Sequence, residues 1–392
     1  MDLPRKLALA VQKGMEEFPV VTITGPRQSG KTTLIKTQFP NFKYINLEEP
    51  KVQDFARMDP SSFLRQFPDG VILDEVQRVP ELLSYIQVIV DEKKRNGQFI
   101  LSGSHQFTMM RSINQSLAGR TAVFHLLPFS LSELQQSNLL IPKNLDINEF
   151  LIKGFYPRIY SSKTSSDFFY SSYFETYVER DVRELIMIKD LSLFKKFITL
   201  CAGRVGQILN KDSLARDVGI SAKTVEEWLS VLEASFIIFR LQPYFENIGK
   251  RLIKSPKLYF YDVGLVCFLL GIENEKHVTT HPLRGNIFEN MQVSEAIKWR
   301  FNQGKQHRFY FYRDTKDNEI DLIFSYGGKL YPIEIKSAET FRDEFLKGIR
   351  SVKDYIQLER PFVVYGGVEK QVRTEFDLVP WYGLEESLEE IC

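Results

Sequence analysis

The octapeptide GPRQSGKT, from Gly25 to Thr32, is the strongest structural signal in this chain of 392 residues. It fits the pattern G-x-x-x-x-G-K-[ST] and stands between an apolar run, Val20–Thr24, and a helical pattern, Thr32–Gln38. The glycines allow the loop to wrap so that successive backbone N–H groups face a phosphate anion at a helix N-terminus. The sequence therefore predicts a strand, a phosphate-binding loop and a helix in that order.

The loop also predicts its ligands, ATP and Mg²⁺. Lys31 can reach the β- and γ-phosphates, and the Thr32 hydroxyl can take a place on Mg²⁺. GTP is disfavoured because no DxxG follows the loop, and NKDS at residues 210–213 departs from NKxD in its last residue. The residues expected to contact the nucleotide are Gly25, Pro26, Arg27, Gln28, Ser29, Gly30, Lys31, Thr32 and Thr33.

An apolar run that ends in two carboxylates, VILDE at residues 71–75, supplies the acidic partner of this loop. We expect Asp74 to hold Mg²⁺, usually through water, and Glu75 to polarise an attacking water. The pair therefore favours hydrolysis over simple storage of nucleotide.

Two further sets of side chains are candidates to assist hydrolysis. The next strand, Phe99–Ser102, places Ser102 and Ser104 where they can sense the γ-phosphate or orient the water, or form an ordinary serine-rich turn. Arg111 and Arg120 can neutralise transition-state charge in cis or in a neighbouring subunit, or can be ordinary surface arginines.

Composition limits the class of protein. Hydrophobic residues make up 43% and charged residues 26%, which is typical of a soluble globular chain and excludes disorder. Lys and Arg number 51 against 50 Asp and Glu, so nucleic acid would need a local basic patch. Three scattered cysteines, no signal-peptide core, and a longest apolar run about half the length of a bilayer span predict a cytoplasmic protein without membrane contact.

The pattern along the chain predicts an α/β fold in three parts. Strand and helix patterns alternate up to residue 140, which favours a parallel sheet covered on both faces. Residues 141–250 are largely helical, and β-type runs return in residues 251–392. The expected strands are Val20–Thr24, Phe42–Leu47, Val71–Asp74, Phe99–Ser102, Ala122–Leu127, Leu258–Tyr261, Arg308–Tyr312, Glu319–Phe324, Leu330–Ile335 and Pro361–Tyr365.

The helical middle part contains the pattern of a winged helix. Residues 213–221 predict a short helix and a glycine turn, and a second helix follows with Ser221 as its N-cap. A β-rich run, Phe236–Leu241, comes next, and Lys223 and Thr224 would lie at the exposed start of the second helix. Because Glu226 and Glu227 would repel phosphate, two interpretations stay open: a DNA-binding unit and a unit that packs against protein.

A second set of charged residues lies near the C-terminus. The runs EIDLI at residues 319–323 and LYPIEIK at 330–336 flank a Gly-Gly turn and predict a hairpin. Residues two apart on a strand share a face, so Glu334 and Lys336 point together, and the hairpin can bring Asp321 beside Glu334. Two carboxylates and a lysine can hold a divalent cation and a water nucleophile.

Residues 15–135 resemble the AAA-type ATPases of prokaryotes, and in particular an uncharacterised branch of them. That resemblance implies Mg²⁺-dependent ATP hydrolysis. The segments that carry it are Thr24–Thr32, Leu73–Gln77, Leu101–Ser104, Ser116–Arg120 and Pro128–Ser130.

The C-terminal part resembles the PD-(D/E)xK core of restriction-endonuclease-like proteins, in which the same ATPase branch commonly ends. By this resemblance Asp321 and Glu334 would bind Mg²⁺, Lys336 would orient a water, and Glu289, on an expected helix over residues 286–299, would be a further metal ligand. Such domains also occur without cleavage activity. Two functions stay open: an ATPase coupled to DNA binding or cleavage, and an ATP-dependent switch that binds a protein partner or assembles as a homo-oligomer.

Overall fold

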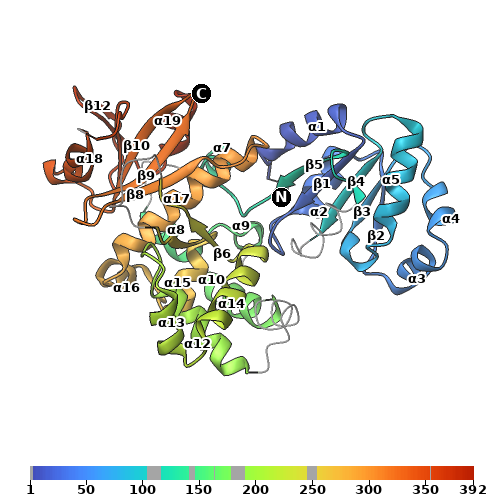
Figure 1. The fold of residues 1–392 in the computed structure, drawn as a ribbon, viewed down its shortest axis with the longest axis horizontal. Coiled ribbons are helices and arrows are strands. Elements are labelled where there is room, and N and C mark those ends of the chain that lie inside the picture. The colour runs from blue at the N-terminus through green and yellow to red at the C-terminus, as the bar shows by residue number, and fades with distance from the viewer. Residues whose placement is uncertain are drawn as a thin grey trace. The chain divides into compact units, whose positions relative to one another are not determined.

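In the computed structural model of the chain, residues 3–103, 116–140, 146–162, 164–177, 190–244, 254–353 and 355–392 are described (Figure 1). The chain folds as two units. The first runs to Phe129 and includes the short segments 234–236 and 300–306, and the second contains the rest. The second unit thus holds both the helical middle part and the C-terminal sheet, and the division into 1–140, 141–250 and 251–392 stays a prediction.

A parallel sheet forms the centre of the first unit, as the alternation of strands and helices predicts. The strand order is β2-β3-β4-β1-β5, and every neighbouring pair is parallel. The strands are β1 (Val20–Thr24), β2 (Lys43–Asn46), β3 (Val71–Asp74), β4 (Phe99–Gly103) and β5 (Thr121–His125). Because β4 lies between β1 and β3, three carboxyl ends meet at one edge of the sheet.

Helices cover both faces of this sheet (Figure 1). Successive strand residues point to opposite faces, so Ile72 packs with one set of helices and Val71 and Leu73 with the other. The first set is α1 (Leu7–Glu17) and α2 (Lys31–Gln38), and the second is α3 (Pro50–Met58), α4 (Pro60–Arg65) and α5 (Leu82–Lys93), with the short turn η1 (Val76–Arg78). The buried apolar layers on both sides fix the edge that carries the loop.

The second unit begins with a helical part. Its helices are α7 (Leu131–Gln136), α8 (Ile147–Lys153), α9 (Pro157–Ser161), α10 (Ser166–Tyr173), α12 (Leu191–Ala202), α13 (Lys211–Val218), α14 (Ala222–Ala234), α15 (Val263–Leu269) and α16 (Glu275–Thr280). The Ser221 hydroxyl accepts a hydrogen bond from the backbone N–H of Thr224 at 3.0 Å, so the predicted cap of α14 is present. β6 (Ile238–Leu241) then pairs antiparallel with β7 (Lys257–Phe260). Among the described residues, no helix has the length and apolar character needed to cross a membrane.

A mixed sheet forms the end of the second unit, with strand order β12-β13-β11-β10-β9-β8. The predicted hairpin is present, since β9 and β10 pair antiparallel, while β10, β11 and β13 run parallel. The elements are α17 (Arg284–Asn302), β8 (Phe309–Arg313), β9 (Glu319–Tyr326), β10 (Lys329–Lys336), η4 (Asp343–Leu346), α18 (Lys347–Val352), β11 (Phe362–Tyr365), β12 (Gln371–Val372), β13 (Asp377–Pro380) and α19 (Leu384–Glu389). The sequence did not predict β12 or β13.

A close approach between α18 and β9 yields a test of this packing. A Cβ on Gly348 would lie 1.8 Å from the carbonyl oxygen of Glu319, where no side chain fits. We expect Gly348→Ala to lower the free energy of unfolding by about 2 kcal/mol or more, since backbone must move to relieve the overlap. In the control Gly285→Ala, the nearest atom to the new Cβ is 4.0 Å away, and stability should change little. Urea unfolding measures both, and equal stabilities of the two variants would contradict the described packing.

Candidate functional site

The phosphate-binding loop follows β1 and approaches the chain after β5 very closely. Gly25 has φ +152°, and a Cβ there would lie 2.1 Å from the carbonyl oxygen of Leu126, so only glycine fits. Gly30 has φ +94° and directly precedes α2, which makes it the second position that requires glycine. Gly25 and Gly30 are thus required for different reasons, Gly25 by a close backbone contact and Gly30 by its left-handed backbone.

Two buried cations hold the loop. Lys31 is 6% exposed, and its Nζ donates to the carbonyl oxygens of Gly25 and Pro26, both at 2.9 Å. Burial lowers the pKa of Lys31 to about 8, although Glu75 and Asp74 act in the opposite direction. A phosphate anion would favour the charged form in the same way.

The second cation is Arg5, which contacts the loop from the start of the chain. Its guanidinium donates to the carbonyl oxygens of Ser29 (2.7 Å) and Leu127 (2.6 Å) and lies over the Phe129 ring. Lys31 and Arg5 therefore both hold the loop backbone before any ligand binds, which lowers the entropic cost of binding.

The carboxylate of Asp74, at the end of β3, joins three other elements of the sheet edge. Thr32 Oγ1 on α2 donates to Asp74 Oδ2 at 2.8 Å, and the Tyr44 hydroxyl on β2 donates to the same oxygen at 2.7 Å. Ser102 Oγ, on β4, donates to Asp74 Oδ1, which also accepts the backbone N–H of Glu75 at 3.1 Å. Asp74 is 5% exposed, and four hydrogen-bond donors orient its carboxylate.

Glu75 takes the next position along the chain. Its backbone is left-handed (φ +55°), which turns the chain sharply after β3, and its carboxylate accepts a hydrogen bond from Gln77 Nε2. Left-handed backbone is uncommon for a residue with a side chain and recurs at functional sites. Asp74 and Glu75 thus stand at the same sheet edge as the loop, as the sequence predicts.

The oxygens at this edge fit a magnesium ion bound to a nucleotide. Mg²⁺ prefers hydroxyl, carboxylate and phosphate oxygens, keeps several waters, and takes only one or two protein ligands in such sites. Thr32 and Asp74 present that pair of oxygens, 2.8 Å apart, beside the loop. These two residues would hold the ion.

The other predicted assistants are placed differently. Ser102 contacts Asp74, so it can act on the nucleotide through that carboxylate. Arg120 precedes β5 at the opposite edge of the sheet and pairs with both oxygens of Asp91 at 2.6 and 2.8 Å, so the structure gives no support to a role in cis. Ser104 and Arg111 lie outside the described residues. The sequence did not single out Tyr44, because β2 carries no motif. The contact of Tyr44 with Asp74 is evident only from the pairing of β2 with β3.

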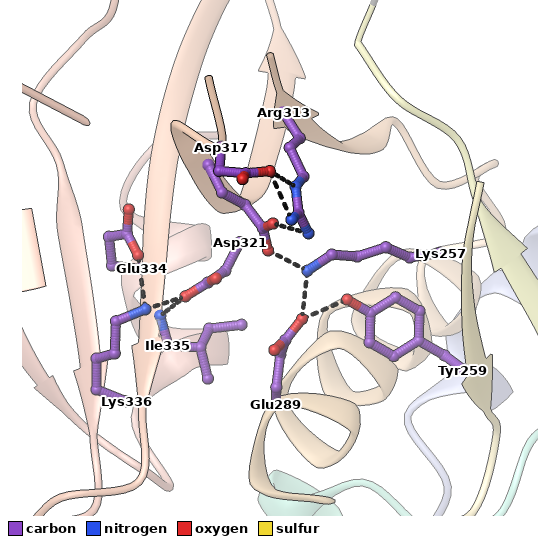
Figure 2. Close-up of polar contacts among 10 residues, drawn as sticks. Lys257, Tyr259, Glu289, Arg313, Asp317, Asp321, Glu334, Ile335 and Lys336 are labelled. Atoms are coloured by element: carbon purple, nitrogen blue, oxygen red, sulfur yellow. Dashed lines mark hydrogen bonds and ion pairs between the residues drawn. The ribbon is translucent and has the colours of Figure 1, made fainter. Parts of the chain in front are cut away.

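The C-terminal candidates are brought together by the β9–β10 hairpin (Figure 2). Lys336 Nζ lies 2.6 Å from Asp321 Oδ2 and 2.9 Å from Glu334 Oε2, and the backbone N–H of Ile335 donates to Asp321 at 2.8 Å. Burial would raise the pKa of Asp321, but Lys336 and Lys257 outweigh it and hold that pKa at about 2. Burial and the Asp321 charge raise the pKa of Glu334 well above its usual range.

Glu289, on α17, contacts a different partner. Lys257, on β7, lies 2.9 Å from Glu289 Oε1 and 2.5 Å from Glu319 Oε1, and the Tyr259 hydroxyl donates to Glu289 at 2.5 Å (Figure 2). The Lys257 side chain is only 2% exposed. Sequence reasoning missed Lys257, Tyr259 and Glu319, although a lysine that opens an apolar strand is a usable signal.

The arrangement does not match the predicted metal site. No group of three or more His, Cys, Asp or Glu side chains in the described part of the chain is disposed to hold a metal ion. Asp321 and Glu334 converge on the ammonium of Lys336, and Glu289 converges with Glu319 on that of Lys257. The structure therefore brings Asp321, Glu334 and Lys336 together as predicted, and directs Glu289 to Lys257.

Comparison with known families agrees with the first site. Residues 17–135 match the family model described as an AAA domain, so the chain contains an AAA-type P-loop ATPase domain, and this match supports ATP binding. Residues 144–276 and 284–384 match two domains of unknown function, DUF8612 and DUF4143.

The relatives cover most of the chain. An uncharacterized protein of Mycobacterium tuberculosis is 27% identical over 93% of this chain and 80% of its own length. An uncharacterized protein of Haemophilus influenzae is 23% identical over 71% of this chain and 74% of its own length. Among solved structures, a Walker-type ATPase of Pyrococcus abyssi (15% identical, TM-score 0.46, 67% of this chain and 94% of that chain) and nucleotide-bound DnaA of Aquifex aeolicus (16%, 0.30, 57% and 86%) are similar.

The contact between Tyr44 and Asp74 predicts a magnesium-specific defect. We expect Tyr44→Phe to weaken ATP binding in the presence of Mg²⁺ by roughly three- to tenfold, the net value of a typical intramolecular hydrogen bond of about 0.7–1.4 kcal/mol. ATP binding in EDTA should be unchanged, because the Tyr44 hydroxyl donates to the carboxylate that would hold the ion. Titration calorimetry measures both, with Tyr85→Phe, on the exposed side of α5, as the control. An equal loss with and without Mg²⁺ would contradict this role.

Proposed function

We propose that this protein is a Mg²⁺-dependent ATPase whose hydrolysis is coupled to nucleic-acid binding. The observation that carries the first half is the Asp74 carboxylate, held beside Thr32 at 2.8 Å and followed by Glu75. A site that only stored nucleotide would not need a second, differently oriented carboxylate at the sheet edge.

The roles of the chain's residues follow from their positions. The loop amides and Lys31 bind the β- and γ-phosphates, and Thr32 and Asp74 hold Mg²⁺, which neutralises charge that develops on the phosphate oxygens. Glu75 accepts a proton from the attacking water once Gln77 releases its carboxylate. Ser102 keeps Asp74 oriented, and Arg120, if it assists, acts on the nucleotide of a neighbouring copy.

The test of hydrolysis is Glu75→Gln. Glutamine is nearly the same size but cannot accept the proton, so turnover should fall about a hundredfold or more while ATP stays bound. Lys31→Ala should instead lose about tenfold or more in ATP affinity, because the phosphate charge loses its ammonium partner. Phosphate release and ATP binding are measured separately, with Glu81→Gln, an exposed glutamate, as the control. Normal turnover in folded Glu75→Gln would move the water-activating role to another residue, with Ser102 and Ser104 the next candidates.

The helical part supports the second half of the proposal. α13, α14 and the β6–β7 pair follow one another in the order of a winged helix, with Lys223 87% exposed at the start of α14. Glu226 and Glu227 of α14 do not create a free acidic face. Glu226 lies 2.7 Å from Arg240 and 3.1 Å from Lys211, and Glu227 lies 4.0 Å from Lys223. The repulsion of phosphate expected from the sequence is thus reduced at Glu226.

The C-terminal sheet supports a nuclease-like core. A helix, an antiparallel three-stranded meander, a helix and a parallel strand follow in the order α17-β8-β9-β10-α18-β11. Asp321, Glu334 and Lys336 lie together on its central hairpin. We propose that this domain has the restriction-endonuclease-like fold and serves nucleic-acid recognition.

Coupling predicts that DNA stimulates ATP hydrolysis. We expect duplex or single-stranded DNA to raise the rate, and Lys223→Glu to weaken DNA binding roughly tenfold while the basal rate stays the same. Lys13→Glu changes a lysine of comparable exposure (73%) on α1 and serves as the control. Rates with each DNA, and gels of the strands, report stimulation and cleavage separately. If neither DNA binds at low salt, the switch that acts on a protein partner is the better function.

A further inference from the structure

The C-terminal carboxylate cluster is already occupied by cations of the chain. It contains five carboxylates and three basic side chains, all in the second unit. They are Glu289, Asp317, Glu319, Asp321 and Glu334, with Lys257, Arg313 and Lys336. Each carboxylate lies within 3.0 Å of a basic nitrogen (Figure 2).

Lys257 is the most buried cation of this cluster. Its ammonium lies between Glu289, on the helix of the nuclease-like core, and Glu319, which is two residues before Asp321 on β9. The aromatic ring of Phe311 covers it at 5.6 Å, and its side chain is 2% exposed. A buried ammonium is costly unless it is fully paired, and the two carboxylates on either side of Lys257 provide that pairing.

A divalent ion requires the same space. Mg²⁺ and Mn²⁺ take oxygens at about 2.0–2.2 Å in octahedral geometry, some of them from water, so the carboxylates that bind one ion must face a point that no other cation fills. Here the two points of convergence, between Glu289 and Glu319 and between Asp321 and Glu334, are filled by Lys257 and Lys336. The residues present therefore do not fit the metal ion that the nuclease-like core implies.

We infer that Lys257 is a built-in replacement for the divalent cation, so that the C-terminal site is complete without metal and does not perform metal-dependent cleavage. The inference concerns the carboxylate cluster and does not depend on ATP hydrolysis. Lys257 comes from β7, outside the α17–β11 core, so the chain supplies this cation from its middle part.

Binding of Mn²⁺ tests the inference in the full-length protein without nucleotide. Electron paramagnetic resonance counts the bound ions, and an ion at the cluster is one that disappears with Asp321→Asn or, in variants that lack Lys257, with Glu289→Gln. Wild type and Asp321→Asn should bind the same number. Lys257→Met, which removes the ammonium and leaves an uncharged side chain one atom shorter, should bind one ion more, and Lys257→Met combined with Glu289→Gln should lose it again.

Stability provides a second measurement that does not use activity. Lys257→Met leaves buried carboxylates without their cation, so its Tm should fall by on the order of 10 °C, and Mn²⁺ should restore part of that loss. Lys257→Arg keeps the charge and should need no metal. If wild type binds an ion that Asp321→Asn removes, the inference is wrong, and this comparison holds even if Lys257→Met fails to fold. A folded Lys257→Met variant that gains no ion also overturns it.

Discussion

One carboxylate, that of Asp74, constrains the whole first unit. It can accept from Thr32, Tyr44 and Ser102 only if α2 begins, and β2 and β4 end, at the same edge, as they do in the parallel order β2-β3-β4-β1. A shift by one residue of β3 would turn this side chain to the other face of the sheet and leave three donors without an acceptor. The apolar layers on both faces therefore hold the register on which the nucleotide site depends.

The second unit also contains buried carboxylates, but their charge is balanced in a different way. In the nucleotide site, Thr32 and Asp74 present oxygens beside a loop that a phosphate and its ion can enter. In the C-terminal cluster, Lys257 and Lys336 lie within hydrogen-bonding distance of the carboxylates, so charge is balanced inside the fold. Desolvation strengthens such pairs and makes the loss of one partner expensive, which is why the ammonium of Lys257 is a fixed part of the structure.

The sequence predicted what local spacing determines. Lys31, Thr32 and Asp74 belong to runs with their own strand or helix signals, and the hairpin that joins Asp321 to Glu334 follows from a Gly-Gly turn between alternating strands. It could not predict contacts that tertiary packing makes: Tyr44 with Asp74, or Lys257 with Glu289, 32 residues further along the chain. Arg120 was a candidate from its place after the loop, but the start of β5 lies at the wrong edge for a role in cis.

The nucleotide site and the C-terminal cluster have different proposed roles. The proposed ATP hydrolysis needs an acceptor for a proton and an ion that can exchange with the product. At the first site Glu75 would be the acceptor, and the Asp74 oxygens, which are oriented by hydrogen bonds, would help to hold the ion. If Lys257 replaces the ion, as we infer, the C-terminal cluster has no exchangeable ion, and it would contribute to recognition without supplying a chemical step. In this proposal, ATP hydrolysis in the first unit is the only step that releases free energy. The second unit would bind its partner with different affinity in the different nucleotide states of the first unit, and ATP would shift the balance between those states.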